Sequence, residues 1–186
     1  MSVSKNSTSQ ATNNAESIYI GRALTCEYQV VLNAMPPAWF ESNPSLLQVQ
    51  VARLISNSRF LIAQSGSTLL GGVAWQDDIA FGALYAKLLF VREKYRQSGI
   101  AIRLIRELLV IGKDAQARAV FADIPEHSTM REVLDDVPGV REVGFIEDFC
   151  EPGVKSIIVQ FDLEGSDRLL RYADKILGGQ KPIETD

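Results

Sequence analysis

The stretch Leu88-Leu-Phe-Val-Arg-Glu-Lys-Tyr-Arg-Gln-Ser-Gly-Ile-Ala101 decides the fold of this 186-residue chain. Its first four residues end an apolar run that is typical of a buried strand, and a basic turn then leads directly into a helix. The start of a helix leaves about four backbone N–H groups unpaired and carries a partial positive charge. The stretch therefore predicts a strand, a turn and a helix whose first turn can bind an anion such as a diphosphate.

Small and basic side chains in the turn favour the same chemistry. Gly99 and Ala101 remove bulk where an anion has to approach the backbone. Arg96 adds a permanent cation that can hold a phosphate through charge-assisted hydrogen bonds. A structural alternative stays open, in which Gly99 only permits a tight connection between strand and helix.

The helix that follows is amphipathic. Its apolar residues recur at steps of three and four, at Ile100, Leu104, Leu108, Ile111 and Ala115. Ile105 and Leu109 widen this stripe, so one face of the helix is expected to be buried. Arg103 and Glu107 are four residues apart on the other side and predict a solvated ion pair.

The segments around this unit alternate between strand and helix patterns. Before it, we expect a strand at 17–22, two helices within 25–55 joined by prolines, a hairpin of 59–64 and 69–75, and a strand at 82–92. After it, we expect a strand at 120–124, a short helix opened by a capping box at 129–132, strands at 143–149 and 155–162, and an amphipathic stretch at 166–177. This order predicts a mixed α/β domain with mostly antiparallel strands early and one strand–helix–strand crossover.

The pattern also divides the chain into three parts. Residues 1–16 are nearly all polar and are expected to be a flexible tail, residues 17–163 form the domain, and residues 164–186 supply a C-terminal helix and tail. The N-terminus has no apolar core and no apolar run reaches the length of a membrane helix, so a cytoplasmic protein without a membrane partner is expected.

Composition excludes several classes of function. The net charge of −4 comes without a basic stripe, which argues against a nucleic-acid partner and mildly favours a cationic substrate. Two cysteines and one histidine give neither a disulfide framework nor zinc-ligand spacing, so no metal is expected. Cys26 and Cys150 are interpreted as buried thiols.

The turn resembles the signature of the GNAT N-acetyltransferase superfamily, Gln/Arg-x-x-Gly-x-Gly/Ala after the fourth strand. Here the signature is Arg96-Gln-Ser-Gly99-Ile-Ala101, and Gly144-Phe145 stands where the family often has Gly-Phe in its sixth strand. The resemblance covers roughly residues 17–163. It implies a single domain with a twisted, mostly antiparallel sheet of about seven strands, splayed between the fourth and fifth and flanked by helices.

The resemblance also implies a cosubstrate, acetyl-CoA, and the residues that bind it. The backbone of Leu89, Phe90 and Val91 would hold the pantetheine arm as if it were an extra strand. The pyrophosphate would bind the amides of the signature loop, which comprises Arg96, Gln97, Ser98, Gly99, Ile100 and Ala101.

The catalytic groups are less defined, because the tyrosine that family members commonly place after the fifth strand falls on Val133 here. The family's frequent glutamate base falls on Tyr85. Glu126 and His127, at the carboxyl end of the fifth strand, compete with Tyr85 for proton transfer, and Asp123 is a further candidate. Asp123 and Glu126 have an alternative interpretation as solvated loop or helix-start residues, and His127 as a structural residue. Asp77 and Asp78 follow a strand and are expected to form a turn, with attraction of a cationic substrate as the alternative.

Two functions follow from the resemblance. The first is an enzyme that transfers an acetyl group from acetyl-CoA directly to a primary amine of a small molecule or peptide. The second is a non-catalytic acyl-CoA-binding module with the same fold, since the expected tyrosine is missing. Four apolar residues either cover the acceptor cleft or form a homodimer contact, namely Trp39, Phe40, Leu46 and Leu47.

Overall fold

The computed structural model describes residues 18–41, 43–78, 82–135, 137, 139–148, 153–163 and 171. The expected N-terminal tail at 1–16 and almost all of the expected C-terminal helix and tail at 164–186 lie outside these residues, as does Cys150. In the described part, no helix is long and apolar enough to cross a membrane.

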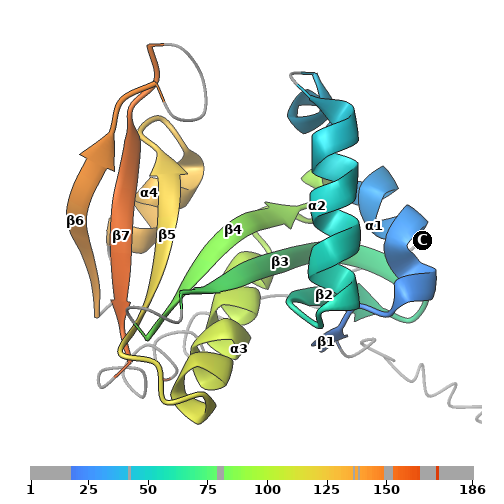
Figure 1. Ribbon diagram of the computed structural model, residues 1–186, viewed down its shortest axis with the longest axis horizontal. Coiled ribbons are helices and arrows are strands. Elements are labelled where there is room, and N and C mark those ends of the chain that lie inside the picture. The colour runs from blue at the N-terminus through green and yellow to red at the C-terminus, as the bar shows by residue number, and fades with distance from the viewer. Residues whose placement is uncertain are drawn as a thin grey trace, which may run out of the picture.

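The described elements follow the predicted order of strands and helices (Figure 1). In chain order they are β1 (Tyr19–Arg22), η1 (Thr25–Glu27), α1 (Tyr28–Ala34), η2 (Pro37–Phe40), α2 (Pro44–Ser56), β2 (Phe60–Ser65), β3 (Thr68–Asp78), β4 (Ala83–Val91), η3 (Glu93–Tyr95), α3 (Ile100–Asp114), β5 (Ala119–Pro125), α4 (Thr129–Asp135), β6 (Val140–Ile146) and β7 (Ser156–Asp162). The proline joint of the first two helices is η2, and Pro44 begins α2, where its missing N–H costs no hydrogen bond.

In the described residues, the seven strands belong to one sheet, in the order β1-β2-β3-β4-β5-β7-β6. Every neighbouring pair in it is antiparallel except β4 and β5, which are parallel and connected through α3. The mixed α/β fold with one crossover is therefore confirmed.

Helices cover the two faces of the sheet in separate hydrophobic clusters. On one face, α1 and α2 pack on β2, β3 and β4 through residues such as Val31, Val51 and Phe60. On the other face, α3 and α4 pack on strands from both ends of the sheet. Over β5, β7 and β6, the face opposite α4 carries no described helix (Figure 1).

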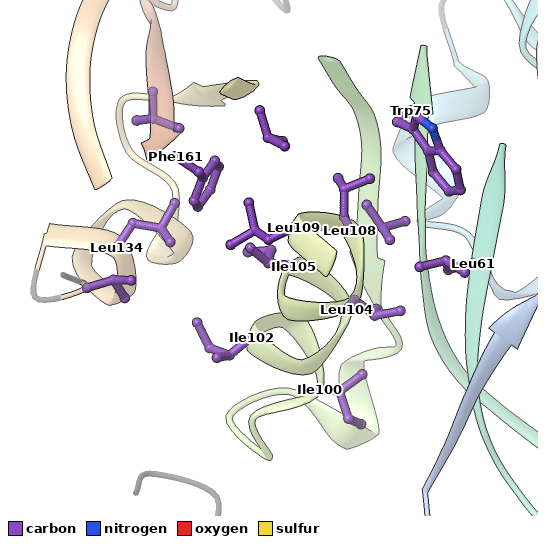
Figure 2. Close-up of a cluster of buried hydrophobic side chains, with 14 of the residues drawn as sticks. Leu61, Trp75, Ile100, Ile102, Leu104, Ile105, Leu108, Leu109, Leu134 and Phe161 are labelled. Carbon is purple, nitrogen blue, oxygen red and sulfur yellow. The ribbon is translucent and has the colours of Figure 1, made fainter. Parts of the chain in front are cut away.

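Helix α3 is buried along two stripes rather than one (Figure 2). Ile100, Leu104 and Leu108 point toward β2 and β3, where Leu61 and Trp75 lie. A second stripe points toward α4 and β7, where Leu134 and Phe161 lie, and it consists of Ile102, Ile105 and Leu109. The helix therefore packs against both halves of the sheet at once.

Several local expectations were wrong. Asp77 and Asp78 do not form a turn but extend β3, and Asp77 accepts a hydrogen bond of 2.8 Å from Nε of Arg59. Among the described residues, Glu107 forms its ion pair with Arg106, at 3.8 Å, and not with Arg103. Cys26 is exposed, because it lies in the short helix η1, which has no buried residue.

Candidate functional site

The strands β4 and β5 separate halfway along β4. Their parallel ladder joins Ala83–Ala86 to Ala119–Ala122 and goes no further, although β4 continues to Val91 and β5 to Pro125. Beyond the ladder, β4 stays paired with β3, and β5 stays paired with β7. A wedge therefore opens in the middle of the sheet, at the place where the resemblance implies a splay (Figure 1).

The edge of β4 that faces this wedge carries backbone groups with no described strand to pair with. The N–H of Arg92 donates to the carbonyl of Leu70 at 2.9 Å, and Phe90 lies opposite Gly72, so these positions point toward β3. Because hydrogen-bonding directions alternate along an antiparallel strand, Leu89 and Val91 point their N–H and C=O into the wedge. Phe90 instead contributes its side chain to the core, where it is 3% exposed.

The turn after β4 is shaped by two left-handed residues. Gln97 has φ 62° and Gly99 has φ 76°. The hydroxyl of Ser98 donates to the carbonyl of Tyr95 at 2.5 Å, which fixes the turn from within. Gly99 is the N-cap of α3 and supplies no side-chain cap, so the amides of Ile100 and Ala101 at the helix start are left for a ligand.

Two arginines flank the start of α3. Arg96 is exposed, and its side chain makes no hydrogen bond or ion pair among the described residues, whereas its backbone N–H donates to the carbonyl of Glu93 at 3.2 Å. Arg103 lies one turn into α3, and helical side chains lean toward the N-terminus. Its Nε is buried and has no hydrogen-bond partner in the described part of the chain. We missed Arg103 from the sequence because we interpreted it as half of a solvated ion pair, yet its position four residues after Gly99 was a usable signal.

Tyr85 lies just before the wedge, on the face of the sheet covered by α1 and α2. Its neighbours in sequence, Leu84 and Ala86, pack in the cluster of α3, so Tyr85 points to the opposite face. It lies opposite Phe121 of β5. Lys87 follows as the extra residue of a β-bulge against β3, and its ammonium group lies 4.0 Å from the centroid of the Tyr85 ring.

The other two catalytic candidates lie just beyond the end of β5. The carboxylate of Glu126 is within 3.7 Å of Arg131 and 3.9 Å of Lys155. His127 is exposed and has no described hydrogen bond or ion pair. Glu126 is five residues beyond Phe121, the partner of Tyr85, which corresponds to about 16 Å along a strand. The structure therefore does not bring the three candidates together.

The apolar residues near the first helices divide between core and surface. Trp39, Phe40 and Leu47 pack against the core, and the Trp39 ring meets the Phe90 ring edge-on, with centroids 6.2 Å apart. Leu46 is 52% exposed. Three of the four residues thus stabilise the α1–α2 cover rather than an open surface.

The described residues also form a cavity away from the wedge, and they contain no metal-ligand cluster. A cavity of about 550 Å³ lies at the far end of α3, lined by Trp75, Asp77 and Asp114 among others, away from the wedge. No group of three or more His, Cys, Asp or Glu residues in the described part could hold a metal ion.

Solved acetyltransferase structures share this architecture at low sequence identity. A GNAT-family acetyltransferase from Bacillus cereus aligns with a TM-score of 0.64 and 16% identity, over 78% of this chain and 97% of that chain. A ribosomal-protein-alanine N-acetyltransferase from Brucella melitensis aligns with a TM-score of 0.65 and 16% identity, over 77% and 99% of the two chains. A spermidine N-acetyltransferase chimera from Vibrio cholerae aligns with a TM-score of 0.65 and 11% identity, over 80% and 97%. These likenesses show the fold.

The family itself is shown by sequence. Among curated proteins no significant match was found. The sequence nevertheless matches the family described as "Acetyltransferase (GNAT) family" over residues 26–131, which is more than half of the chain. The matched region contains the wedge, the turn and all of α3. The chain therefore belongs to the GNAT family of acetyltransferases.

Proposed function

We propose that this N-acetyltransferase binds acetyl-CoA in the wedge between β4 and β5 and transfers the acetyl group directly to a primary amine of a small molecule or peptide. The observation that carries the proposal is the end of the β4–β5 ladder at Ala86 and Ala122, while β4 continues to Val91 and then to a turn that opens α3 with unpaired amides. An extended amide chain and a diphosphate are the two ligand parts that such a site can satisfy.

The pantetheine arm carries two amides, which match the backbone groups that Leu89 and Val91 point into the wedge. The pyrophosphate fits at the helix start, where the signature loop, Arg96 to Ala101, ends in the amides of Ile100 and Ala101 and in the positive end of the α3 dipole. Arg96 and Arg103 add two cations there. Charge-assisted hydrogen bonds to phosphate are about twice as strong as neutral ones.

The reaction requires few catalytic groups. The neutral amine attacks the thioester carbonyl carbon, the carbon–sulfur bond breaks, the amine loses a proton, and the sulfur of coenzyme A leaves as a thiolate that is then protonated. We propose Tyr85 as the group nearest this step. Its pair with Phe121 is the second-to-last pair of the ladder before the wedge, and its side chain faces the side of the sheet that α4 does not cover. Glu126 is held as a charged partner of Arg131 and Lys155, which leaves it and the exposed His127 as weaker candidates.

Two wider properties belong to the same proposal. The exposed free thiol of Cys26 suits a reducing compartment such as the cytoplasm. A homodimer is supported by the apolar side chains on the edge strand β6, where Val143 is 45% and Phe145 is 53% exposed.

The test is an assay of the pure protein with acetyl-CoA and a panel of polyamines, amino acids, aminoglycosides and peptides. We expect release of free thiol that depends on one class of amine, with mass spectrometry showing one added acetyl group on that amine. Binding of acetyl-CoA without turnover on any amine would instead identify a non-catalytic acyl-CoA-binding module.

A further inference from the structure

The first residue beyond the β4–β5 ladder carries a charge on each side of the wedge. The ladder ends at Ala86 and Ala122, so the next residues are Lys87 on β4 and Asp123 on β5. The two chains run parallel and separate from this point. Backbones that were about 4.8 Å apart in the ladder are therefore still close when they present these two side chains.

Both side chains lie on the face that α1 and α2 cover farther along the sheet. The ammonium of Lys87 lies over the ring of Tyr85, which points to that face. On β5, Ala122 and Ile124 pack in the cluster of α3, so the intervening Asp123 points away from α3. A cation and a carboxylate thus line the two walls of the wedge on the side from which an amine would approach.

These opposite charges do not form an ion pair with each other. Lys87 is exposed and has no ion pair among the described residues, its described contact being the Tyr85 ring. Asp123 is partly buried and takes part in an interaction within the protein. The wedge therefore separates a positive wall from a negative one.

We propose that the acceptor is a zwitterionic α-amino acid, with its carboxylate bound by Lys87 and its amino group directed toward Asp123. This inference rests on the proposed acetyltransferase function and names the acceptor class. An α-amino acid carries a carboxylate and an amino group on one carbon, so it presents one group to each of the two walls. A polyamine would match Asp123 but would meet the unpaired cation of Lys87.

The charges near the wedge thus favour an acceptor with a carboxylate, whereas the net charge of the chain favours a cationic acceptor. The net charge of −4 mildly favours a cationic acceptor, but charges more than about 8 to 10 Å away are largely screened at physiological salt. A carboxylate within hydrogen-bonding distance of Lys87 experiences that ammonium far more strongly than distant acidic residues.

The experiment compares each free amino acid with its C-terminal amide and with the amine that lacks the carboxyl group, at fixed acetyl-CoA. For the wild type we expect kcat/KM for one or more free amino acids to exceed that for the amide by about tenfold or more. Lys87→Ala should raise KM for the free amino acid about 10- to 100-fold and leave KM for the amide nearly unchanged. Lys87→Glu should reverse the preference.

Lys113→Ala is the matched control, because it removes a lysine from the last turn of α3, at the opposite end of that helix from the wedge. It should leave both KM values unchanged. Equal loss for acid and amide in Lys87→Ala, or a wild type that prefers amines without a carboxylate, would overturn the inference while the acetyltransferase function stands.

A different outcome separates the two proposals. If no amine is acetylated, the proposed function fails, and calorimetric titration of amino acids into the CoA complex then tests the inference alone. Amino-acid binding that is lost in Lys87→Ala would still support it, and no detectable binding would overturn it.

Discussion

At Gly99 the backbone enters α3 with φ 76°, in the left-handed region that costs an L-residue roughly 1 to 2 kcal/mol. The same residue borders the helix amides that we assign to the pyrophosphate. A side chain here thus has two separable effects, one on backbone strain and one on ligand binding. Gly153 has φ 77°, and a Cβ built there meets nothing within 4 Å, so it carries the strain effect alone.

Gly99→Glu should therefore abolish binding of CoA, because it places bulk and negative charge against the pyrophosphate. Gly153→Glu should lose a similar amount of stability, on the order of 1 kcal/mol, and bind CoA normally. Calorimetry with CoA and denaturant unfolding of both variants measure the two effects. Normal affinity in a folded Gly99→Glu variant would remove the turn from the proposed site.

Arg96→Ala should weaken CoA binding by about 1.5 to 3 kcal/mol, the usual contribution of a hydrogen bond to a charged group. Because Arg96 is exposed, salt should screen this contribution, and the difference from the wild type should shrink between low and high ionic strength. Titrations at two salt concentrations measure it. A loss of CoA affinity that is the same at both salt concentrations would indicate misfolding instead of a lost phosphate contact.

Tyr85→Phe tests the proton-transfer proposal. If the phenol donates to the leaving thiolate or orders a water that takes the amine's proton, kcat should fall about 10²-fold or more with CoA affinity unchanged. An interaction made only in the transition state lowers kcat and kcat/KM together. Glu126→Gln and His127→Ala, measured in the same way, should change kcat little. A fully active Tyr85→Phe enzyme would leave catalysis to positioning and solvent.

Among the elements, α3 has the most demanding position, since it packs against strands on both sides of the wedge (Figure 2). Leu104 is fully buried toward β2 and β3, whereas Val110 is 36% exposed. Leu104→Ala should lower the free energy of unfolding by about 2 to 5 kcal/mol, and Val110→Ala by less than about 0.5 kcal/mol. Urea titrations give both values. Similar small losses would mean that α3 packs more loosely than the structure shows.

Element patterns in the sequence predicted α3 and the turn before it better than they predicted the neighbouring elements. The four-residue steps of Ile100, Leu104 and Leu108 fixed α3, and the small residues of the turn placed its start at Gly99. They did not show the second buried stripe, through Ile102, because its partners Leu134 and Phe161 are distant in sequence. Periodicity reports that a face is buried, and only the tertiary structure reports how many neighbours it has.

Charged residues misled the prediction of strand ends. We expected the sixth strand at 143–149, but β6 runs from Val140 to Ile146. The first residues of β6 are polar and do not read as a strand in the sequence. In the structure, Arg141 donates to the side chain of Gln160, and Glu142 lies 3.5 Å from Arg131. Likewise, the pair of Arg59 and Asp77 extends β3 beyond its apolar run. Charged side chains with partners on neighbouring strands, helices or loops let a strand continue where its own apolar pattern has stopped.

For the whole molecule, the ligand should add substantial stability. A ligand at a free concentration one hundred times its Kd stabilises the folded state by about 2.7 kcal/mol. For a domain of this size, that corresponds to a rise in Tm of roughly 5 to 11 °C. Thermal scans with and without CoA measure the shift. Gly99→Glu should show no shift, and a wild type without one would contradict a site in the wedge.

The short ladder between β4 and β5 has a mechanical consequence. Four residues of each strand, Ala83–Ala86 and Ala119–Ala122, form the junction between two larger parts of the sheet. We call these parts plates: one holds β1 to β4 and the other holds β5, β7 and β6, and α3 packs against both. A ligand wedged between the plates sets the angle at which they meet. Lys87 belongs to one plate and Asp123 to the other, so that angle also sets the spacing of the groups that we assign to the acceptor. Acetyl-CoA should therefore bind first and the acceptor second, in a compulsory order.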